Sequence, residues 1–129
     1  MVDRPTLSKG EMAIARTLWN IGPATVRQVF EALPANLKMD FSTAQTYLRR
    51  LESKSHASSK LNGRVRVYSA RTKPHTVIRD TVKELVDRLF AGDTLPLARH
   101  LIEERGIDEN GLAELRQLID RLEQEGNQQ

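Results

Sequence analysis

The chain has 129 residues, no cysteine, three histidines and a formal net charge of +3 at pH 7. The missing cysteines exclude disulfides and thiolate metal sites, and the widely spaced histidines lack ligand partners, so neither a metal site nor a cofactor is predicted. No apolar run is long enough to span a membrane, and the N-terminus lacks an apolar signal core, so we expect a cytoplasmic protein.

The charge is unevenly distributed along the chain. Residues 1–72 contain twelve Lys or Arg against five Asp or Glu, whereas residues 73–129 contain eight against twelve. The basic excess is greatest over residues 42–71, where seven basic residues accompany one acidic residue. A basic N-terminal half beside an acidic C-terminal half indicates that nucleic acid is bound at one end only.

Two helices are predicted in the first third of the chain. Each begins with a capping box, the first at Ser8 and the second at Thr25. Gly22 and Pro34 are expected to end them. Their apolar residues recur at helical spacing, which predicts that both helices face one core. These residues are Met12, Ala15, Leu18, Trp19, Val26, Val29, Phe30 and Leu33.

A third helix is predicted to begin at Ser42, where Gln45 completes a capping box, and to end near Lys54. One side is apolar and is expected to face the core; it consists of Ala44, Tyr47, Leu48 and Leu51. The other side offers hydroxyls, an amide and guanidiniums, which suit base edges in a DNA major groove. The residues predicted to contact bases are Ser42, Thr43, Gln45, Thr46 and Arg49. For this helix alone, a solvated polar face is the alternative.

A β-hairpin is predicted around Asn62-Gly63, because a type I′ turn needs positive φ at both central residues. Its strands are residues 58–61 and 64–70. Val65 and Val67 are expected on an apolar face, and Arg64, Arg66 and Tyr68 on the other, basic face. Three helices and this hairpin predict a mainly α fold with a small β-hairpin wing, a winged helix-turn-helix. Residues flanking the base-contacting face are predicted to contact the DNA backbone. They are Thr25 through its amide, Arg27, Arg50, Lys54, Arg64 and Arg66.

Residues 73–129 are predicted to form three further helices, separated at Gly92 and Gly106, with Asp108 capping the last. Their apolar stripes are too thin to be buried within a monomer of this size. A second copy of the chain is the natural cover, and packing against the N-terminal domain is the alternative. We therefore predict a winged-helix DNA-binding domain over residues 1–72 and a helical dimerisation domain over residues 73–129. The predicted dimerisation residues are Ile78, Val82, Leu85, Leu89, Leu112, Leu115, Ile119 and Leu122.

Short motifs over nearly the whole chain, roughly residues 6–122, carry a family resemblance. They are Leu7-Ser-Lys-Gly-Glu11, Leu18-Trp19, Gly22, Thr25-Val-Arg-Gln-Val29, Ser42-Thr43, Thr46-Tyr-Leu-Arg-Arg-Leu51, Gly63-Arg64, Tyr68 and Leu89-Phe-Ala-Gly92. In order and spacing they resemble the penicillinase repressor family, which includes bacterial β-lactamase, methicillin-resistance and copper-responsive repressors. The resemblance implies a homodimeric winged-helix repressor on a palindromic operator in double-stranded DNA. It also implies release when a membrane sensor-protease is triggered and the C-terminal part is cut.

The chain departs from the family pattern at several positions. Ala44 stands where the family usually has Val or Ile, and Gln45 often differs, so we expect a different operator sequence. The Lys-Gly pair that usually follows the recognition helix is Lys54-Ser55. The cleavage position, Asn-Phe in the antibiotic-resistance members, is His100-Leu101 here, so the sequence leaves open whether release is proteolytic. Without cysteine the chain lacks the hook of the copper sensors.

Two functions follow from these patterns. The first is a transcriptional repressor, and the second is a winged helix that binds a protein, with its basic residues serving solubility or an acidic partner. A polar recognition face, a basic wing and a dimerising tail in one chain favour the repressor. An enzyme is not predicted, because no nucleophile, base and orienting group recur at a suitable spacing.

Overall fold

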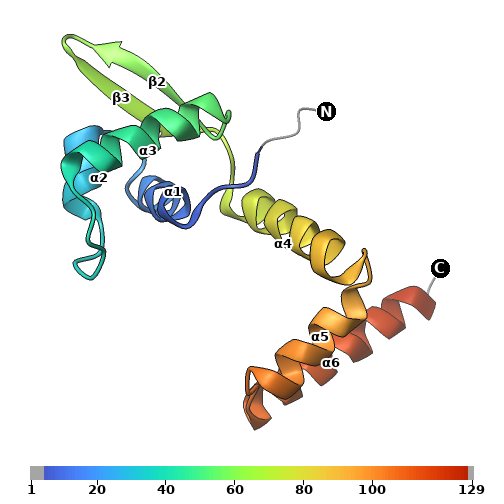
Figure 1. The fold of residues 1–129 in the computed structure, drawn as a ribbon. Coiled ribbons are helices and arrows are strands. Elements are labelled where there is room, and N and C mark those ends of the chain that lie inside the picture. Colours follow the sequence, from blue (N-terminus) through green and yellow to red (C-terminus); the bar gives the residue numbers. More distant parts are fainter. Residues whose placement is uncertain (1–4, 128–129) are drawn as a thin grey trace. The chain divides into compact units, whose positions relative to one another are not determined.

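The computed structural model describes residues 5–127, and within them six helices and a small antiparallel sheet (Figure 1). The elements are α1 (Lys9–Ile21), β1 (Ala24–Thr25), α2 (Val26–Ala32), α3 (Phe41–Ser53), β2 (Ala57–Asn62), β3 (Val65–Ala70), α4 (Pro74–Phe90), α5 (Thr94–Glu104) and α6 (Glu109–Asn127). The predicted mainly α class with a small wing is confirmed. The chain divides into two compact units, residues 1–82 and 83–129.

No helix in the described part of the chain is long and apolar enough to cross a membrane. The expectation of a missing signal segment concerns in part residues 1–4, which lie outside the described residues.

Both predicted capping boxes at the start of the chain are confirmed. The amide of Ser8 donates to Glu11 Oε1 at 2.8 Å, and the amide of Glu11 donates to Ser8 Oγ at 3.2 Å. Thr25 and Gln28 exchange the corresponding pair at 2.9 and 3.2 Å. Gly22 ends α1 with φ of +80°, a conformation that glycine adopts without a Cβ penalty.

The start of α3 differs from the prediction. Asp40 is the N-cap, and its Oδ1 accepts the Thr43 amide hydrogen at 2.7 Å. Ser42 therefore lies inside the first turn, and the predicted Ser42–Gln45 capping box is wrong. Aspartate is as good an N-cap as serine, so the earlier cap prevails and brings Phe41 into the helix. The predicted end is confirmed, because Lys54 is the C-cap.

The sheet has the order β1-β3-β2, with both pairs antiparallel. Asn62 pairs with Val65, so the central residues of the hairpin turn are Gly63 and Arg64. Gly63 has φ of +67° and Arg64 is not in the positive region. The predicted type I′ turn centred on Asn62-Gly63 is therefore wrong by one residue. A turn that needs positive φ only at its first central residue is the type II′ pattern.

The alternation of residues between the two faces of the hairpin is as predicted, with Val65 and Val67 on one face and Arg66 and Tyr68 on the other. Tyr68 is buried in the core, whereas Val65 is exposed. The face that carries Arg66 is therefore also the face that enters the core, at Tyr68. The short strand β1, which was not predicted, fixes this orientation by pairing Ala24 with Tyr68.

The core of the first unit contains every apolar residue predicted to face it from the three helices, either buried or packed against the buried cluster. Trp19 packs there, and its Nε1 donates to the carbonyl of Thr72 at 2.7 Å. Val77, in the first turn of α4, belongs to the same buried cluster. The core therefore draws on residues beyond position 72, and the predicted functional boundary at that position stays a prediction.

The second unit consists of the rest of α4 with α5 and α6. The three predicted C-terminal helices are confirmed, with breaks at Gly92 and Gly106, whose φ values are +85° and +72°. Asp108 Oδ1 accepts the amide hydrogen of Gly111 at 2.8 Å and caps α6. Among the described residues of α5 and α6, none is buried.

Candidate nucleic-acid interface

The residues predicted to contact bases lie together on the outward side of α3. The helix buries Ala44, Leu48 and Leu51 on its other side, and the helical period then turns the polar residues toward solvent. Ser42, Thr46 and Arg49 are exposed, and Thr43 and Gln45 are half-buried. The N-terminal end of α3 thus presents the mixture of donors and acceptors that base edges require.

Hydrogen bonds at the start of α3 fix the polarity of this face. The Thr46 hydroxyl donates to the Ser42 carbonyl at 3.1 Å, so its oxygen still faces solvent as an acceptor. Hydrogen bonds from the backbone and side chain of Thr43 hold the pKa of Asp40 below its ordinary value of 3.8. Asp40 is therefore ionised at neutral pH, and its position as the N-cap, which was not predicted, places a negative charge at the start of α3. The available signal was an N-cap residue type two positions before Ser42.

Arg27 lies against the start of α3. Its guanidinium carbon is 5.2 Å from the centre of the Phe41 ring, within the range of a cation–π contact. The Phe41 ring meets Phe30 edge to face, with centroids 5.7 Å apart. A long contact of 3.8 Å to Glu31 is exposed and adds little. The stack places an exposed cation beside the N-terminal end of the recognition helix.

Two predicted backbone-contacting groups already have partners in the protein. The Thr25 amide donates to Gln28 Oε1 at 2.9 Å. Lys54 Nζ lies 2.6 Å from Oε1 of Glu11 and also donates to the Thr6 carbonyl at 3.1 Å. A phosphate would have to displace these partners, and the two predicted phosphate contacts stay predictions. Gln28 stands three positions after Thr25, in the capping box predicted there, whereas Glu11 lies 43 positions from Lys54.

The remaining cations predicted to contact the DNA backbone are all exposed, but they differ in the contacts that they make within the protein. Arg64 is exposed in the turn of the wing, and Arg50 is exposed with its guanidinium carbon 5.6 Å from the Tyr47 ring. Arg66 is also exposed, but its Nη1 donates to Ser59 Oγ at 2.9 Å. The hairpin projects away from the helices of its unit (Figure 1), so Arg64 is carried at its tip.

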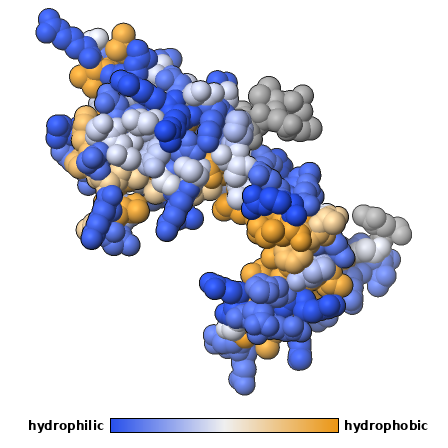
Figure 2. Space-filling model, viewed as in Figure 1, coloured by the Kyte–Doolittle hydropathy of each residue, from blue (hydrophilic) through white to orange (hydrophobic). Residues whose placement is uncertain are grey.

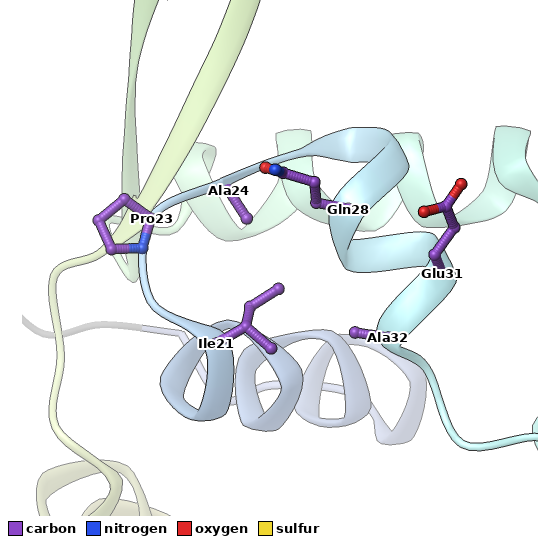
Figure 3. Close-up of a pocket in the computed structure, with 6 residues that line it drawn as sticks. All are labelled: Ile21, Pro23, Ala24, Gln28, Glu31 and Ala32. Atoms are coloured by element: carbon purple, nitrogen blue, oxygen red, sulfur yellow. The ribbon is translucent and has the colours of Figure 1, made fainter.

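A hollow of about 380 Å³ lies between the end of α1 and the length of α2 (Figure 3). Its lining residues contain no Lys or Arg; they are Ile21, Pro23, Ala24, Gln28, Glu31 and Ala32. The hollow therefore lacks the positive charge that binding to phosphates requires. Among the described residues, no group of three or more His, Cys, Asp or Glu could hold a metal ion.

A three-helix core, a recognition helix with an outward polar face and a basic hairpin define a winged-helix DNA-binding protein. The solution structure of the DNA binding domain of the repressor BlaI has this fold, with a TM-score of 0.50 and 26% identity over 57% of this chain and 90% of that one. The sequence profile of the penicillinase repressor family matches residues 7–121, and the chain belongs to this family. It is a DNA-binding transcriptional repressor and not an enzyme.

Two further solved structures are similar. The Bacillus licheniformis BlaI monomeric form in complex with the blaP half-operator has a TM-score of 0.49 and 26% identity, over 57% of this chain and 90% of that one. The CopR repressor structure has a TM-score of 0.45 and 25% identity, over 56% of this chain and 100% of that one. A search of curated protein sequences found no match.

Proposed function

We propose that this repressor acts as a homodimer on an inverted-repeat operator, with each protomer placing α3 in the major groove of one half-site. The observation that carries the proposal is the unburied apolar surface of α5 and α6, in a chain whose other unit has a complete recognition face. A single recognition helix contacts only a few base pairs, so two must be joined to distinguish an operator from other DNA.

The apolar surface of the second unit supports a second copy as the cover. Leu89 is 61% exposed and Leu122 is 54% exposed. In the space-filling view, orange side chains gather over the second unit (Figure 2). Soluble monomers rarely leave large apolar patches uncovered. A two-fold dimer covers the same patch on both chains, because the interface is self-complementary. The proposed interface consists of Leu85, Leu89, Leu112, Leu115, Ile119 and Leu122 of the second unit, together with Ile78 and Val82 in the part of α4 that belongs to the first unit.

The proposed division of labour on DNA follows the exposure of the side chains. Base edges are contacted by the outward side of α3, namely Ser42, Thr43, Gln45, Thr46 and Arg49. Phosphates are contacted by Arg27 beside α3, by Arg50 in the last turn of α3 and by Arg64 at the tip of the wing. These are long cations that flank the recognition face, which is the arrangement that fixes register on the duplex.

A second candidate concerns release from DNA. The pair His100-Leu101 lies within α5, and both residues are exposed. A protease needs an extended segment, so cutting there requires local unfolding of a helix that, over its described residues, buries no side chain. A cut at this pair separates α6, with half of the proposed dimerisation residues, from the DNA-binding unit. We propose this route for the case in which a membrane sensor-protease acts on the repressor.

The experiment is selection of binding sites from random double-stranded DNA by the full-length chain. The proposal predicts enrichment of an inverted repeat whose half-sites are centred about one helical turn, or a multiple of it, apart. Enrichment of a single asymmetric site, or of no sequence, would contradict the dimeric repressor and leave the monomeric or protein-binding alternative. Incubation with a sensor-protease, followed by mass analysis of the fragments, tests the cut at His100-Leu101.

A further inference from the structure

Three polar side chains form a bridge between the recognition helix and the wing. Ser59 Oγ, on β2, donates to Glu52 Oε2, in the last turn of α3, at 2.6 Å. Arg66 Nη1, on β3, donates to the same Ser59 Oγ at 2.9 Å. We infer that Glu52, Ser59 and Arg66 are positioning residues, which hold the wing at the angle to α3 that DNA binding needs. This inference rests on the proposed use of both α3 and the wing on the operator.

Ser59 can make both hydrogen bonds of the bridge at the same time. A serine hydroxyl has one donor and two acceptor positions, so Ser59 can donate to the carboxylate and accept from the guanidinium at once. Both hydrogen bonds involve an ionised partner and are stronger than bonds between neutral groups. Ser59 is half-buried, as is Glu52, which limits the competition from water.

The strand register explains why these residues meet. Ser59 lies opposite Tyr68, and Arg66 lies opposite Leu61. Arg66 is therefore the diagonal neighbour of Ser59 on the same face of the hairpin, within reach of a long side chain. Since Tyr68 on this face enters the core, the bridge stands at the point where the hairpin leaves the core.

Beyond this point little else holds the wing. Leu61 and Val65 are exposed, and an isolated two-stranded hairpin is marginally stable. From Ser59 to the turn at Gly63 the strand extends about 13 Å, at about 3.3 Å per residue, so a tilt of about 10° moves the tip by about 2 Å. A shift of that size removes Arg64 from hydrogen-bonding distance of a phosphate.

The charge of Glu52 makes the inference testable by the sign of an effect. Glu52 is the single acidic residue among residues 42–71, and a carboxylate near DNA is repelled by the phosphates. If Glu52 merely opposes DNA or withholds Arg66 from it, Glu52→Ala raises operator affinity. If Glu52 positions the wing, the same substitution lowers it.

The experiment measures operator binding by the full-length chain over a range of salt concentrations. We expect Ser59→Ala and Glu52→Ala each to lower operator affinity by about threefold to tenfold and to lower the slope of log K against log salt by up to about 1, because the displaced wing loses the phosphate contact of Arg64. The double variant Ser59→Ala/Arg66→Ala should lose no more than the larger single loss, because one bridge is broken once. Ser58→Ala, on the opposite face of β2, is the matched control and should bind like the unsubstituted chain.

Two results would overturn the inference while leaving the repressor proposal intact. One is a gain of affinity in Glu52→Ala. The other is a salt slope that falls by about 1 in Arg66→Ala while the affinity and salt slope of Ser59→Ala equal those of the unsubstituted chain. That result would make Arg66 a phosphate contact. A readout without DNA guards against failure of the operator assay: NMR order parameters of the Gly63 and Arg64 amides should fall in Ser59→Ala and not in Ser58→Ala. Order parameters that are equal in Ser59→Ala and Ser58→Ala would also overturn the inference.

Discussion

Lys54 Nζ lies 2.6 Å from Oε1 of Glu11 and joins the C-cap of the recognition helix to the first turn of α1. The Glu11 side chain is 2% exposed and that of Lys54 is 27% exposed. Burial alone raises the pKa of Glu11, but the hydrogen bonds from Lys54 and Ser8 outweigh it and hold the pKa below its ordinary value of 4.5. The pair therefore orients α3 against the core, and a lysine predicted to face DNA has a structural role.

Replacing Lys54 by methionine keeps the aliphatic stem and removes the ammonium. The substitution leaves the Glu11 carboxylate buried without its cation, and because Lys54 is partly solvated we expect a loss of about 1–3 kcal/mol in the free energy of unfolding. Urea unfolding measures it. Lys60→Met, at an exposed position of β2, is the matched control and should change stability little. Equal stability of the two variants would show that the pair contributes nothing.

The lowered pKa of Glu11 predicts a dependence of stability on pH. A carboxyl group whose pKa is lower in the folded than in the unfolded chain contributes stability above its unfolded pKa, and this contribution is lost as the pH falls through the folded pKa. Stability should therefore fall as the pH drops below about 4.5, more steeply than in Glu11→Gln. Asp40 also has a lowered pKa, and it is common to both chains. Parallel curves of unfolding free energy against pH would contradict the prediction.

Ser55 occupies the position where the family usually has glycine, and its φ is +67°. This left-handed conformation costs a residue with a Cβ about 1–2 kcal/mol. Glycine avoids that cost, but part of the gain in stability is offset because glycine makes the unfolded chain more flexible. We expect Ser55→Gly to stabilise the protein by about 0.5–1 kcal/mol, measured by thermal and urea unfolding. Ser55→Ala keeps the Cβ and removes the hydroxyl, so it isolates the contribution of the side-chain oxygen. A Gly variant no more stable than the Ala variant would contradict the role of φ.

Gln45 is the side chain of α3 best suited to adenine, whose N6 and N7 it can contact together. Gln45→Ala should weaken operator binding and relax preference at one base pair in each half-site, by about 1–3 kcal/mol. Arg64→Ala is the contrasting control, expected to weaken binding to all sequences alike and to lower the salt slope by about 1. Binding to a library of operator variants measures both. An unchanged base preference would remove Gln45 from the base-contacting residues.

Local signals in the sequence predicted most of the fold. The capping boxes at Ser8 and Thr25 and the glycine at position 22 act within a few residues, and each is confirmed. The errors arise where two local solutions compete. Asp40 and Ser42 are both good caps, and a glycine at position 63 allows two neighbouring turns. Strand β1 has two residues, too few to show an alternating pattern in the sequence.

The contacts that define the site were harder to predict, because they join residues far apart in the chain. The outward face of α3 follows from helical period alone. Of the five predicted base-contacting residues, Ser42, Thr46 and Arg49 are exposed on it, and Thr43 and Gln45 are half-buried. Lys54 meets a partner 43 positions away, and a cation in a basic segment gives no sign of such a pair. Arg66 meets Ser59 across the hairpin, but Ser59 also meets Glu52 on α3, and a contact between hairpin and helix depends on packing that no local pattern in the sequence shows.

The central claim, that dimerisation through the second unit makes operator binding tight, is tested most directly by Ile119→Asp. Ile119 is exposed on α6, so the new charge leaves the folded protomer intact and is buried only in the dimer. Sedimentation of the full-length chain with a parallel operator titration should show a dimer that becomes a monomer and loses about 10²–10⁴ in apparent affinity. Gln117→Asp, exposed on the same helix, should remain dimeric and bind tightly. A monomeric Ile119→Asp variant that binds the operator as tightly as the unsubstituted chain would contradict the claim.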